Sequence, residues 1–236
     1  MQAVILAGGL GSRLRPYTMH IPKPLLPLGD KPVIEIVVRQ LAASGIDDVI
    51  ITTGFLAHLV EAYVGNGEQF GTNVRYVREE SPLGTAGPLR EVSDLEEHFL
   101  VLNGDLLTTF NFGGLLDDHA RSGADLTVAA TRRTVHIDYG VVVTNTAGDL
   151  ERYDEKPTLD YHVSMGIYGV SLSALKHMPP TGRFDMPELV RAIVAAGGRV
   201  CTAKTDVYWQ DIGRFDDYQT ASADFVTTPD RFLRGA

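Results

Sequence analysis

The sequence predicts an α/β protein with a mostly parallel central sheet and helices on both of its faces. In the first half of the chain, apolar runs of strand length alternate with segments whose apolar residues recur at helical spacing. Several of these apolar runs end in glycines or in a carboxylate. Because ligands in open α/β sheets bind outside the carboxyl ends of the strands, we expect the binding site at these strand ends.

The first half reads as repeated strand and helix units. Residues 1–6 form an apolar run, and residues 31–44 have helical periodicity, with Pro32 near the start and Gly45 just past the end. The apolar run at residues 47–53 completes a strand, helix and strand unit. We further expect a helix at residues 56–64, strands at residues 74–78 and 99–102, and the start of a helix at residues 86–92.

The second half is richer in strands. After Asp125 the sequence predicts strands at residues 126–131, 140–144, 163–170 and 200–204, with one helix at residues 187–196. We expect these strands to join the same sheet and to build a small β-rich lid over the ligand. Residues 221–236 carry apolar side chains and are expected to pack as a helix and a short extension.

The composition is that of an ordinary globular chain. Its 236 residues are 44% hydrophobic and 22% charged, which predicts one domain over residues 1–236. A net charge of -9 argues against general nucleic-acid binding. The single cysteine, Cys201, excludes an internal disulfide and a cysteine metal cluster, and we interpret it as a small buried residue in a reducing compartment. No stretch has the ~18 apolar residues of a membrane span, so we expect a cytoplasmic protein without a membrane partner.

A glycine-rich segment follows the first apolar run. Residues 6–16 read L-A-G-G-L-G-S-R-L-R-P, and successive N–H groups in such a turn form a concavity that binds anions. Arg13 and Lys23 supply the positive charges that a polyphosphate needs. The dinucleotide fingerprint is excluded because Leu14 stands where Gly or Ala is required, and the Walker pattern is absent.

Together with P-K-P-L-L-P at residues 22–27, this segment resembles the N-terminal double motif of the sugar-1-phosphate nucleotidyltransferases. Ser12 takes the usual Thr position and keeps the hydroxyl. The resemblance implies a Rossmann-like, GT-A-like fold with a nucleotide-binding half at residues 1–110, a sugar-binding half at residues 111–220 and a C-terminal tail at residues 221–236. The implied nucleotide ligands in this region are Leu6, Ala7, Gly8, Gly9, Gly11, Ser12, Arg13 and Lys23, to which Gly104 is added.

A second segment, E-E-S-P-L-G-T-A-G-P-L at residues 79–89, combines a strand end with glycines and a helix start. In the resembled family this segment contacts the nucleobase, which implies Glu80, Pro82, Gly84 and Thr85 as nucleotide ligands. Its form is most similar to the guanylyltransferase branch, whereas thymidylyltransferases usually carry P-x-G-L-A-Q-A. The segment could also be a plain helix start.

Two carboxylates are candidate metal ligands. V-L-N-G-D ends in Asp105 after an apolar strand, and a carboxylate fixed at a strand end suits Mg²⁺ together with phosphate oxygens. Asp211 in W-Q-D-I-G matches the family's second metal ligand near the C-terminus. By resemblance, Asp105 and Asp211 hold Mg²⁺, and with Arg13 and Lys23 they form the catalytic set. Trp209 is interpreted as a buried aromatic that positions Asp211.

The sugar side is carried over from the family at three short motifs and at the strand end before Asp105. The implied sugar-phosphate ligands are Asn103, Tyr139, Gly140, Glu155, Lys156, Ser164 and Gly166. Among them, Glu155 would accept from sugar hydroxyls and Lys156 would bind the phosphate. Ser164 replaces the family's usual Asn, so the hydroxyl pattern of the accepted sugar is expected to differ from the common hexoses.

The resemblance therefore implies transfer of a nucleoside monophosphate from GTP to a manno-configured hexose or heptose 1-phosphate, with a nucleoside triphosphate and a sugar 1-phosphate as partners. Uridylyl or thymidylyl transfer, a non-sugar acceptor such as choline or polyol phosphate, and a catalytically inert sugar-nucleotide sensor stay open as alternatives. The oligomeric state is not encoded in any motif, and a homo-oligomer stays open too.

Overall fold

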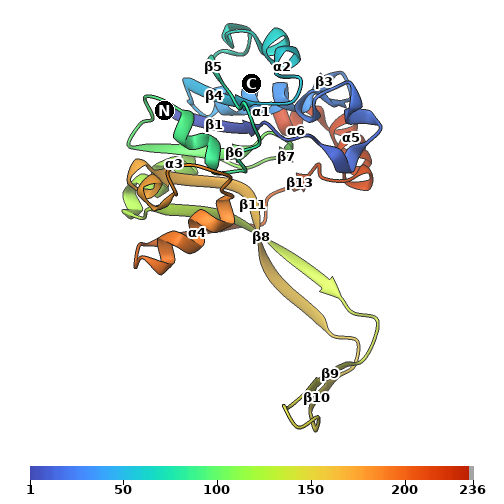
Figure 1. The fold of residues 1–236 in the computed structure, drawn as a ribbon. Helices are drawn as coiled ribbons and strands as arrows, with labels where there is room; N and C mark the ends of the chain where they lie inside the picture. The colour runs from blue at the N-terminus through green and yellow to red at the C-terminus, as the bar shows by residue number, and fades with distance from the viewer. Residues whose placement is uncertain (234–236) are drawn as a thin grey trace.

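The computed structural model describes residues 1–233, and its centre is a seven-stranded sheet (Figure 1). The strand order is β12-β8-β11-β6-β1-β4-β5. Only β11 among these strands runs antiparallel to its neighbours β6 and β8, so the predicted mostly parallel sheet is confirmed. The bounds are β1 Gln2–Ala7, β4 Asp48–Thr53, β5 Asn73–Arg78, β6 His98–Asn103, β8 Leu126–His136, β11 Thr158–Ser171 and β12 Val200–Thr205.

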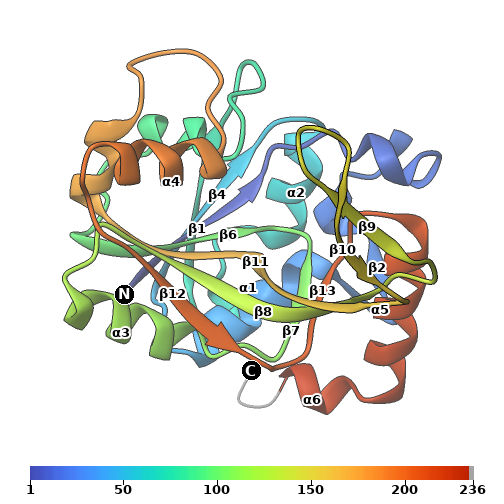
Figure 2. The ribbon, with the colours of Figure 1, turned by 90° about the horizontal axis from the view of Figure 1, so that it is seen from below.

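Helices cover both faces of the sheet because successive strand residues point to opposite sides. Ile5 of β1 packs into a core with Ile34 of α1, while its neighbour Val4 packs into a second core with Leu189 of α4. Figure 2 shows α4 on one side of the sheet and α1 and α3 on the other. The bounds are α1 Val33–Ala43, α2 Ala57–Val64, α3 Phe112–Ser122, α4 Met186–Ala195, α5 Phe215–Thr227 and α6 Pro229–Leu233.

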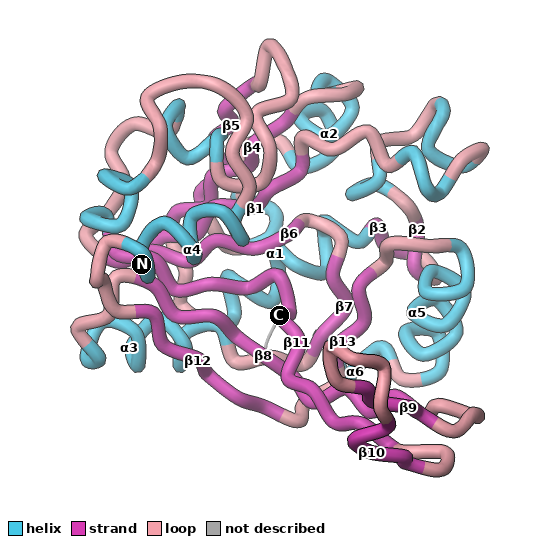
Figure 3. Tube along the Cα trace, turned by 60° about the horizontal axis from the view of Figure 1, so that its bottom comes forward, coloured by secondary structure: helices cyan, strands magenta, loops and turns pink. Residues whose placement is uncertain are grey.

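Short strands and 3-10 helices connect the elements of this framework. Strands β7 Leu106–Thr108 and β13 Trp209–Asp211 pair antiparallel, as do β2 Pro27–Leu28 and β3 Lys31–Pro32. Figure 3 shows β7 and β13 side by side next to the sheet. The 3-10 helices are η1 Ser12–Leu14, η2 Tyr17–Met19, η3 Lys23–Leu25, η4 Glu68–Phe70, η5 Gly87–Glu91 and η6 Leu172–His177.

Strands β8 and β11 continue far past the sheet as a two-stranded ribbon, which we call the arm (residues 132–163). The arm ends in a second hairpin, β9 Val141–Thr144 with β10 Leu150–Asp154, and it points away from the body (Figure 1). Three of the strands predicted for the second half, at residues 126–131, 163–170 and 200–204, join the central sheet as β8, β11 and β12, whereas the one predicted at residues 140–144 is β9 and pairs only with β10. Their β-rich extension, however, is an exposed arm instead of a lid over the chain's own ligand site, because the β8 and β11 ladder stays paired and extended.

Most predicted elements of the first half are confirmed within a residue or two. The segment at residues 86–92 forms the 3-10 helix η5 instead of the expected α-helix, and α3 was not predicted. The tail boundary drawn at residue 221 falls inside α5, and the final part of the expected tail, residues 234–236, lies outside the described residues. No helix within residues 1–233 has the length and apolar character needed to cross a membrane.

Candidate active site

A cavity of about 660 Å³ lies at the carboxyl ends of β1 and β6, where the sequence predicted a ligand. Its lining comes from the glycine-rich loop, residues 79–85 and the end of β6. Strands β11 and β13 and the residues just before α4, Arg183 and Asp185, complete it. The lining residues that the sequence also predicted are Leu6, Gly8, Gly9, Gly11, Ser12, Arg13, Lys23, Pro82, Gly84, Thr85, Asn103, Asp105, Ser164, Gly166 and Asp211.

The glycine-rich loop is shaped by two requirements on its backbone. A Cβ atom at Gly8 would stand 2.1 Å from Oε1 of Glu79, so this carboxylate lies directly against the loop. Gly11 has a left-handed backbone (φ +60) and begins η1, whose Leu14 N–H donates to the Gly11 carbonyl (3.0 Å). Thr18 also donates to that carbonyl (2.8 Å), which fixes the loop where Arg13 leaves it.

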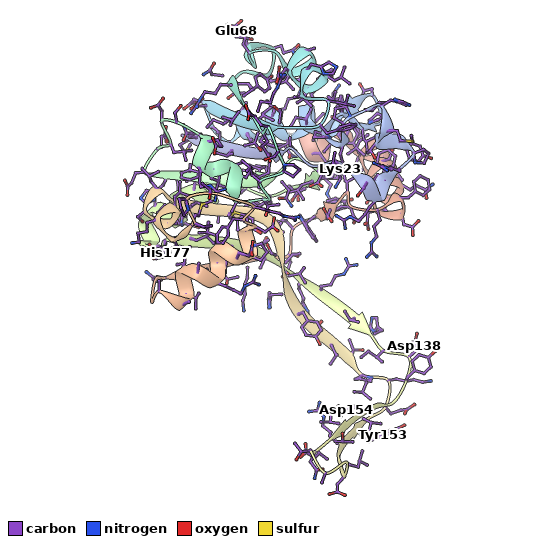
Figure 4. All side chains as sticks on the ribbon, in the orientation of Figure 1. Lys23, Glu68, Asp138, Tyr153, Asp154 and His177 are labelled. Atoms are coloured by element: carbon purple, nitrogen blue, oxygen red, sulfur yellow. The ribbon has the colours of Figure 1, made fainter. Side chains whose placement is uncertain are left out.

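Charged side chains from three separate segments meet on the floor of the cavity. Lys23 forms an ion pair with Asp105, and both side chains are mostly buried. Asp211 is brought beside them because it lies opposite Leu106 in the β13 and β7 pair and because Ile212 N–H donates to the Asp105 carbonyl (3.0 Å). Figure 4 shows Lys23 in the body of the molecule, inside this cluster of elements.

The pKa of Asp211 is raised by its position in this group of charges. Burial raises it above the ordinary value, and repulsion from Asp105 raises it further, while Lys23 and Arg13 act in the opposite direction. Arg13 also lies next to Gly213, where an added Cβ would meet Arg13 at 3.5 Å and the Asp211 carboxylate at 2.7 Å. Two cations and two carboxylates therefore share one small volume.

A second wall of the cavity is built around Glu79. Its N–H donates to the Thr53 carbonyl (2.7 Å), which extends the β5 pairing by one residue and turns the side chain toward the glycine-rich loop. One carboxylate oxygen accepts from Leu83 N–H (3.1 Å), and burial raises the pKa of Glu79. The neighbouring Glu80, which the sequence analysis named, is exposed and does not line the cavity, whereas Glu79 does.

Gly84 and Thr85 are tied to the start of α4. Gly84 has φ +84, and a Cβ there would stand 2.5 Å from the Phe184 carbonyl, so only glycine fits. Thr85 N–H donates to the Asp185 carboxylate (2.9 Å), and its hydroxyl accepts from Met186 N–H (2.8 Å). The helix start expected here is the 3-10 helix η5, which begins at Gly87, and Thr85 lies in the turn before it and anchors α4.

The third wall is a bulge in β11. The ladder with β8 shifts register between Ser164 and Tyr168, and Gly166 takes a left-handed backbone (φ +70) in which a Cβ would stand 2.5 Å from Asn103 Nδ2. Ser164 Oγ accepts from Gly166 N–H (3.3 Å) and donates to the Tyr168 hydroxyl (3.2 Å). Trp209 Nε1 donates to the Met165 carbonyl (2.8 Å), which links this wall to β13 and agrees with a positioning role for the tryptophan.

Comparison with known proteins shows the family of this chain. A family model described as nucleotidyl transferase matches residues 2–228. The chain belongs to the nucleotidyl transferase family. The resemblance drawn from the motifs of the first half is thereby confirmed.

Several relatives of this nucleotidyl transferase are named for one activity. A mannose-1-phosphate guanyltransferase of Schizosaccharomyces pombe is 34% identical over 97% of this chain and 65% of its own. A mannose-1-phosphate guanylyltransferase of Mycobacterium tuberculosis is 33% identical over 100% of this chain and 68% of its own. The chain thus spans about two thirds of the length of these curated relatives.

Solved structures share the fold of this nucleotidyl transferase. A putative glucose-1-phosphate thymidylyltransferase from Bacillus anthracis superposes with a TM-score of 0.74 and 25% identity, covering 94% of both chains. HddC from Yersinia pseudotuberculosis superposes with a TM-score of 0.73 and 22% identity over 95% of this chain and 99% of that one.

The carboxylates of this nucleotidyl transferase fit a divalent cation. Asp105 Oδ1 is buried and has no hydrogen-bond partner among the described residues, although buried polar atoms are normally satisfied. Asp211 lies close enough to Asp105 for the two carboxylates to repel each other, and a bound cation would relieve this repulsion. Two carboxylates complemented by phosphate oxygens are a donor set that suits Mg²⁺, and no group of three or more His, Cys, Asp or Glu within residues 1–233 offers an alternative metal site.

Several predicted ligands do not line the cavity. Ala7 and Gly104 are buried behind the loop, where Gly104 N–H donates to the Leu6 carbonyl (3.0 Å). Four predicted sugar-phosphate ligands lie on the distal part of the arm: Tyr139, Gly140, Glu155 and Lys156. Figure 4 shows Asp138 and Tyr153 there, far from Lys23. The pairing of β8 with β11 keeps these residues extended from the body, so the chain's own cavity is formed without them.

Proposed function

We propose that this chain transfers GMP from GTP to a manno-configured hexose or heptose 1-phosphate, giving a GDP-sugar and pyrophosphate, in a reaction that uses Mg²⁺. The observation that carries the proposal is the meeting of Arg13, Lys23, Asp105 and Asp211 on the floor of one cavity below a glycine-rich loop. These groups suit a polyphosphate and a cation, and they offer no nucleophile of their own.

The chemistry needs positioning and charge neutralisation. A phosphate oxygen of the sugar 1-phosphate attacks the α-phosphorus of GTP, the bond from that phosphorus to the bridging oxygen breaks, and pyrophosphate leaves. No general base is required, because a phosphate monoester is already largely ionised at neutral pH. Arg13 and Lys23 line the cavity, and in the proposed reaction they neutralise the charge that develops on the transferring phosphoryl group.

Asp105 and Asp211 would hold the metal. A bound Mg²⁺ supplies charge neutralisation at phosphate oxygens and orients the two phosphates. The contribution of the chain is to surround both carboxylates with positive charge. Lys23 forms an ion pair with Asp105, and Lys23 and Arg13 lower the pKa of Asp211 against the larger effect of burial.

The preference for guanine rests on Glu79. The Watson–Crick edge of guanine presents two adjacent donors, N1–H and the N2 amino group, and a carboxylate accepts from both. Thymine and uracil present one donor between two carbonyl oxygens, which a carboxylate would repel. Glu79 stands beside the glycine-rich loop with one oxygen held by Leu83 N–H, as a fixed reader of the base would. The names of the relatives, mannose-1-phosphate guanyltransferases, support the same donor and acceptor.

The test is pyrophosphate release with Mg²⁺ across GTP, dTTP, UTP, CTP and ATP against mannose, glucose, N-acetylmuramic acid and manno-heptose 1-phosphates, with choline and polyol phosphates as further acceptors. We expect GTP to release pyrophosphate far faster than the other nucleotides, and a manno-configured sugar 1-phosphate to be its best acceptor. High activity with dTTP or UTP instead would overturn the assignment of guanine. If a folded protein that binds nucleotide released no pyrophosphate with any substrate pair, the inert sugar-nucleotide sensor would be favoured.

A further inference from the structure

The distal part of the arm holds a group of residues in contact with one another that do not line the cavity of the same chain. Tyr153 packs its ring on Gly140, where an added Cβ would stand 2.2 Å from the tyrosine oxygen, and its hydroxyl donates to the Glu155 carboxylate (3.0 Å). Lys156 follows with a left-handed backbone (φ +45), a conformation that is uncommon for a residue other than glycine. The two sequence motifs Y-G-V and E-K-P are thus already assembled side by side.

This group cannot reach the chain's own cavity along the arm as it is built. Ser164 lines the cavity, and Lys156 precedes it by eight positions, just before β11 begins at Thr158. At the rise of an extended strand, the part of β11 from Thr158 to Ser164 alone spans roughly 20 Å. The ladder is unbroken from Ser164 paired with Ala130 to Thr158 paired with His136, so bending the arm back would break backbone hydrogen bonds.

The β11 wall of the cavity lacks the charged groups that the arm carries. Strand β11 contributes Ser164, Met165, Gly166 and Tyr168 to the lining, and none of these side chains is charged. The cations elsewhere in the lining already lie against carboxylates, since Lys23 pairs with Asp105, Arg183 pairs with Asp185 and Arg13 lies beside Asp211. A sugar phosphate bound against the β11 wall therefore needs a cation and a hydroxyl acceptor from elsewhere, and Lys156 and Glu155 have that chemistry.

The arm exposes several large apolar side chains to solvent, which is unfavourable. Tyr139 is 79% exposed, and the arm also exposes Val142, Leu150, Tyr153 and Tyr161. An isolated two-stranded hairpin is marginally stable at best in water, and exposed apolar surface of this kind marks an interaction site. The arm thus has the character of a segment that packs against another surface.

A matching surface lies beside the cavity. Tyr17, Phe215, Tyr218 and Val226 line an open groove of about 490 Å³ between η2 and α5, and Tyr17 stacks on Phe215 with ring centroids 5.5 Å apart. The groove adjoins the active site along the chain, since Tyr17 follows Arg13 by four residues. It is apolar and exposed, like the arm.

We infer that two copies of this chain exchange arms, so that each arm packs in the groove of the other copy and delivers Glu155 and Lys156 to that copy's cavity. The inference rests on the proposed function for the role of these two residues. A two-fold arrangement makes the exchange reciprocal and closed, because each copy offers one arm and one groove. Each complete sugar-phosphate site then contains residues of both copies.

The first measurement is the mass in solution by light scattering. The intact chain is expected to be a dimer, and a variant in which residues 137–157 are replaced by an Asn-Gly turn is expected to be a monomer. Val226→Asp in the groove should also shift the chain to monomer, whereas Val194→Asp, an equally exposed valine on α4, should leave the dimer intact. A monomeric intact chain, or a dimer that survives removal of the arm, would overturn the inference.

The second measurement is complementation in a purified mixed dimer. One copy carries Lys23→Ala, and the other carries Glu155→Gln with Lys156→Asn, the asparagine being chosen because it tolerates the left-handed backbone. The two copies carry different affinity tags, so that only the mixed dimer is recovered. If arms are exchanged, one of its two sites is intact, and we expect about half of the intact dimer's pyrophosphate release. If each arm serves its own cavity, both sites are damaged and activity stays at the level of the two parents.

The two failures are separable. An intact chain that releases no pyrophosphate with any substrate pair refutes the proposed function, and the mass measurements still decide whether the arm joins two copies. An active intact chain whose mixed dimer shows no recovery refutes the exchange and leaves the proposed function standing.

Discussion

Lys23 is held in place before any substrate arrives. Its ammonium group pairs with Asp105, and η3 begins at Lys23 between two prolines that limit the backbone. A cation fixed in this way loses little freedom when a phosphate binds, which is the condition for electrostatic stabilisation of a transition state.

We therefore expect Lys23→Ala to lose about a hundredfold or more in turnover, several kcal/mol of barrier. The reason is that the developing charge on the transferring phosphoryl group loses its partner. Pyrophosphate release measures the loss, and circular dichroism checks the fold. Lys31→Ala is the matched control, because Lys31 pairs with Asp30 outside the cavity and its removal should leave turnover unchanged. Near-normal turnover of Lys23→Ala would end this assignment.

Glu79 determines the choice of base in this account. Glu79→Gln keeps the acceptor for Leu83 N–H but replaces an acceptor facing the base with an amide donor. We expect kcat/KM for GTP to fall about tenfold to a hundredfold, the range of one lost bidentate base contact, with dTTP and UTP not reduced. Glu80→Gln changes the exposed neighbour and should leave the ranking of nucleotides as it is. An unchanged GTP preference in Glu79→Gln would show that other groups read the base.

His119 makes stability depend on pH away from the active site. It is fully buried, with its ring nitrogens 2.8 Å from Thr127 Oγ1 and 3.1 Å from Ser171 Oγ. Ser171 gives its hydroxyl proton to the Ala124 carbonyl (2.8 Å), so it accepts from the imidazole and fixes a neutral tautomer. Burial, with repulsion from His98, lowers the pKa of His119 to about 4.

The sign of the effect follows from proton linkage. The unfolded chain binds a proton at this position below about pH 6.5 and the folded chain only below about 4, so stability falls as the pH drops through this window. The loss is about 3 kcal/mol when complete. Denaturant unfolding from pH 7 to pH 4 should show a shallower decline in His119→Gln, and His58→Gln, an exposed histidine, should follow the unmodified chain. Parallel curves for His119→Gln and the unmodified chain would contradict this account.

At the scale of elements, the cavity wall around Glu79 (residues 79–85), which we call the base wall, forms one unit with α4. The Asp185 carboxylate accepts from Thr85 N–H (2.9 Å), and Glu188 accepts from Asp185 N–H (2.7 Å) at the start of the helix. The helix that covers one face of the sheet therefore also fixes the loop after Glu79.

We expect Asp185→Ala to lower the free energy of unfolding by about 1–2 kcal/mol, the typical cost of a lost helix cap, and to raise the KM for GTP because the loop is released. Asp185→Asn retains a side-chain acceptor and should cost less on both measures. Chemical denaturation and steady-state kinetics give the two quantities. A fall in stability without any change in the KM for GTP would show that α4 does not fix the base wall.

At the scale of the whole molecule, the parallel framework and the floor of the site were predictable. Asp105 and the glycine-rich loop follow apolar strands, and parallel strands end at one edge, so their proximity follows from topology. Asp211 was placed by family resemblance alone. The structure supplies the cause, because β13 pairs with β7 directly after Asp105.

Other features could not be predicted for physical reasons. The choice between Glu79 and Glu80 depends on one extra backbone hydrogen bond, to Thr53, that continues β5 past Arg78. Helix α3 has two glycines, Gly113 and Gly114, in its first turn, and glycine is a poor helix former. The residue that caps it, Asn111, is not part of a run of regularly spaced apolar residues. Alternating strand residues look the same in a lid and in an arm, so the direction of the arm was beyond the sequence.

The central claim is that this cavity joins a sugar phosphate oxygen to the α-phosphorus of GTP. The most direct measurement follows a sugar 1-phosphate whose phosphate oxygens carry a heavy isotope, using the best acceptor of the substrate survey, with products analysed by phosphorus NMR and mass spectrometry. We predict that all of the label enters the GDP-sugar and none enters pyrophosphate, because the phosphate of the acceptor is the nucleophile and keeps its own bonds. Label in pyrophosphate, or consumption of GTP with the sugar phosphate left unchanged, would contradict the account.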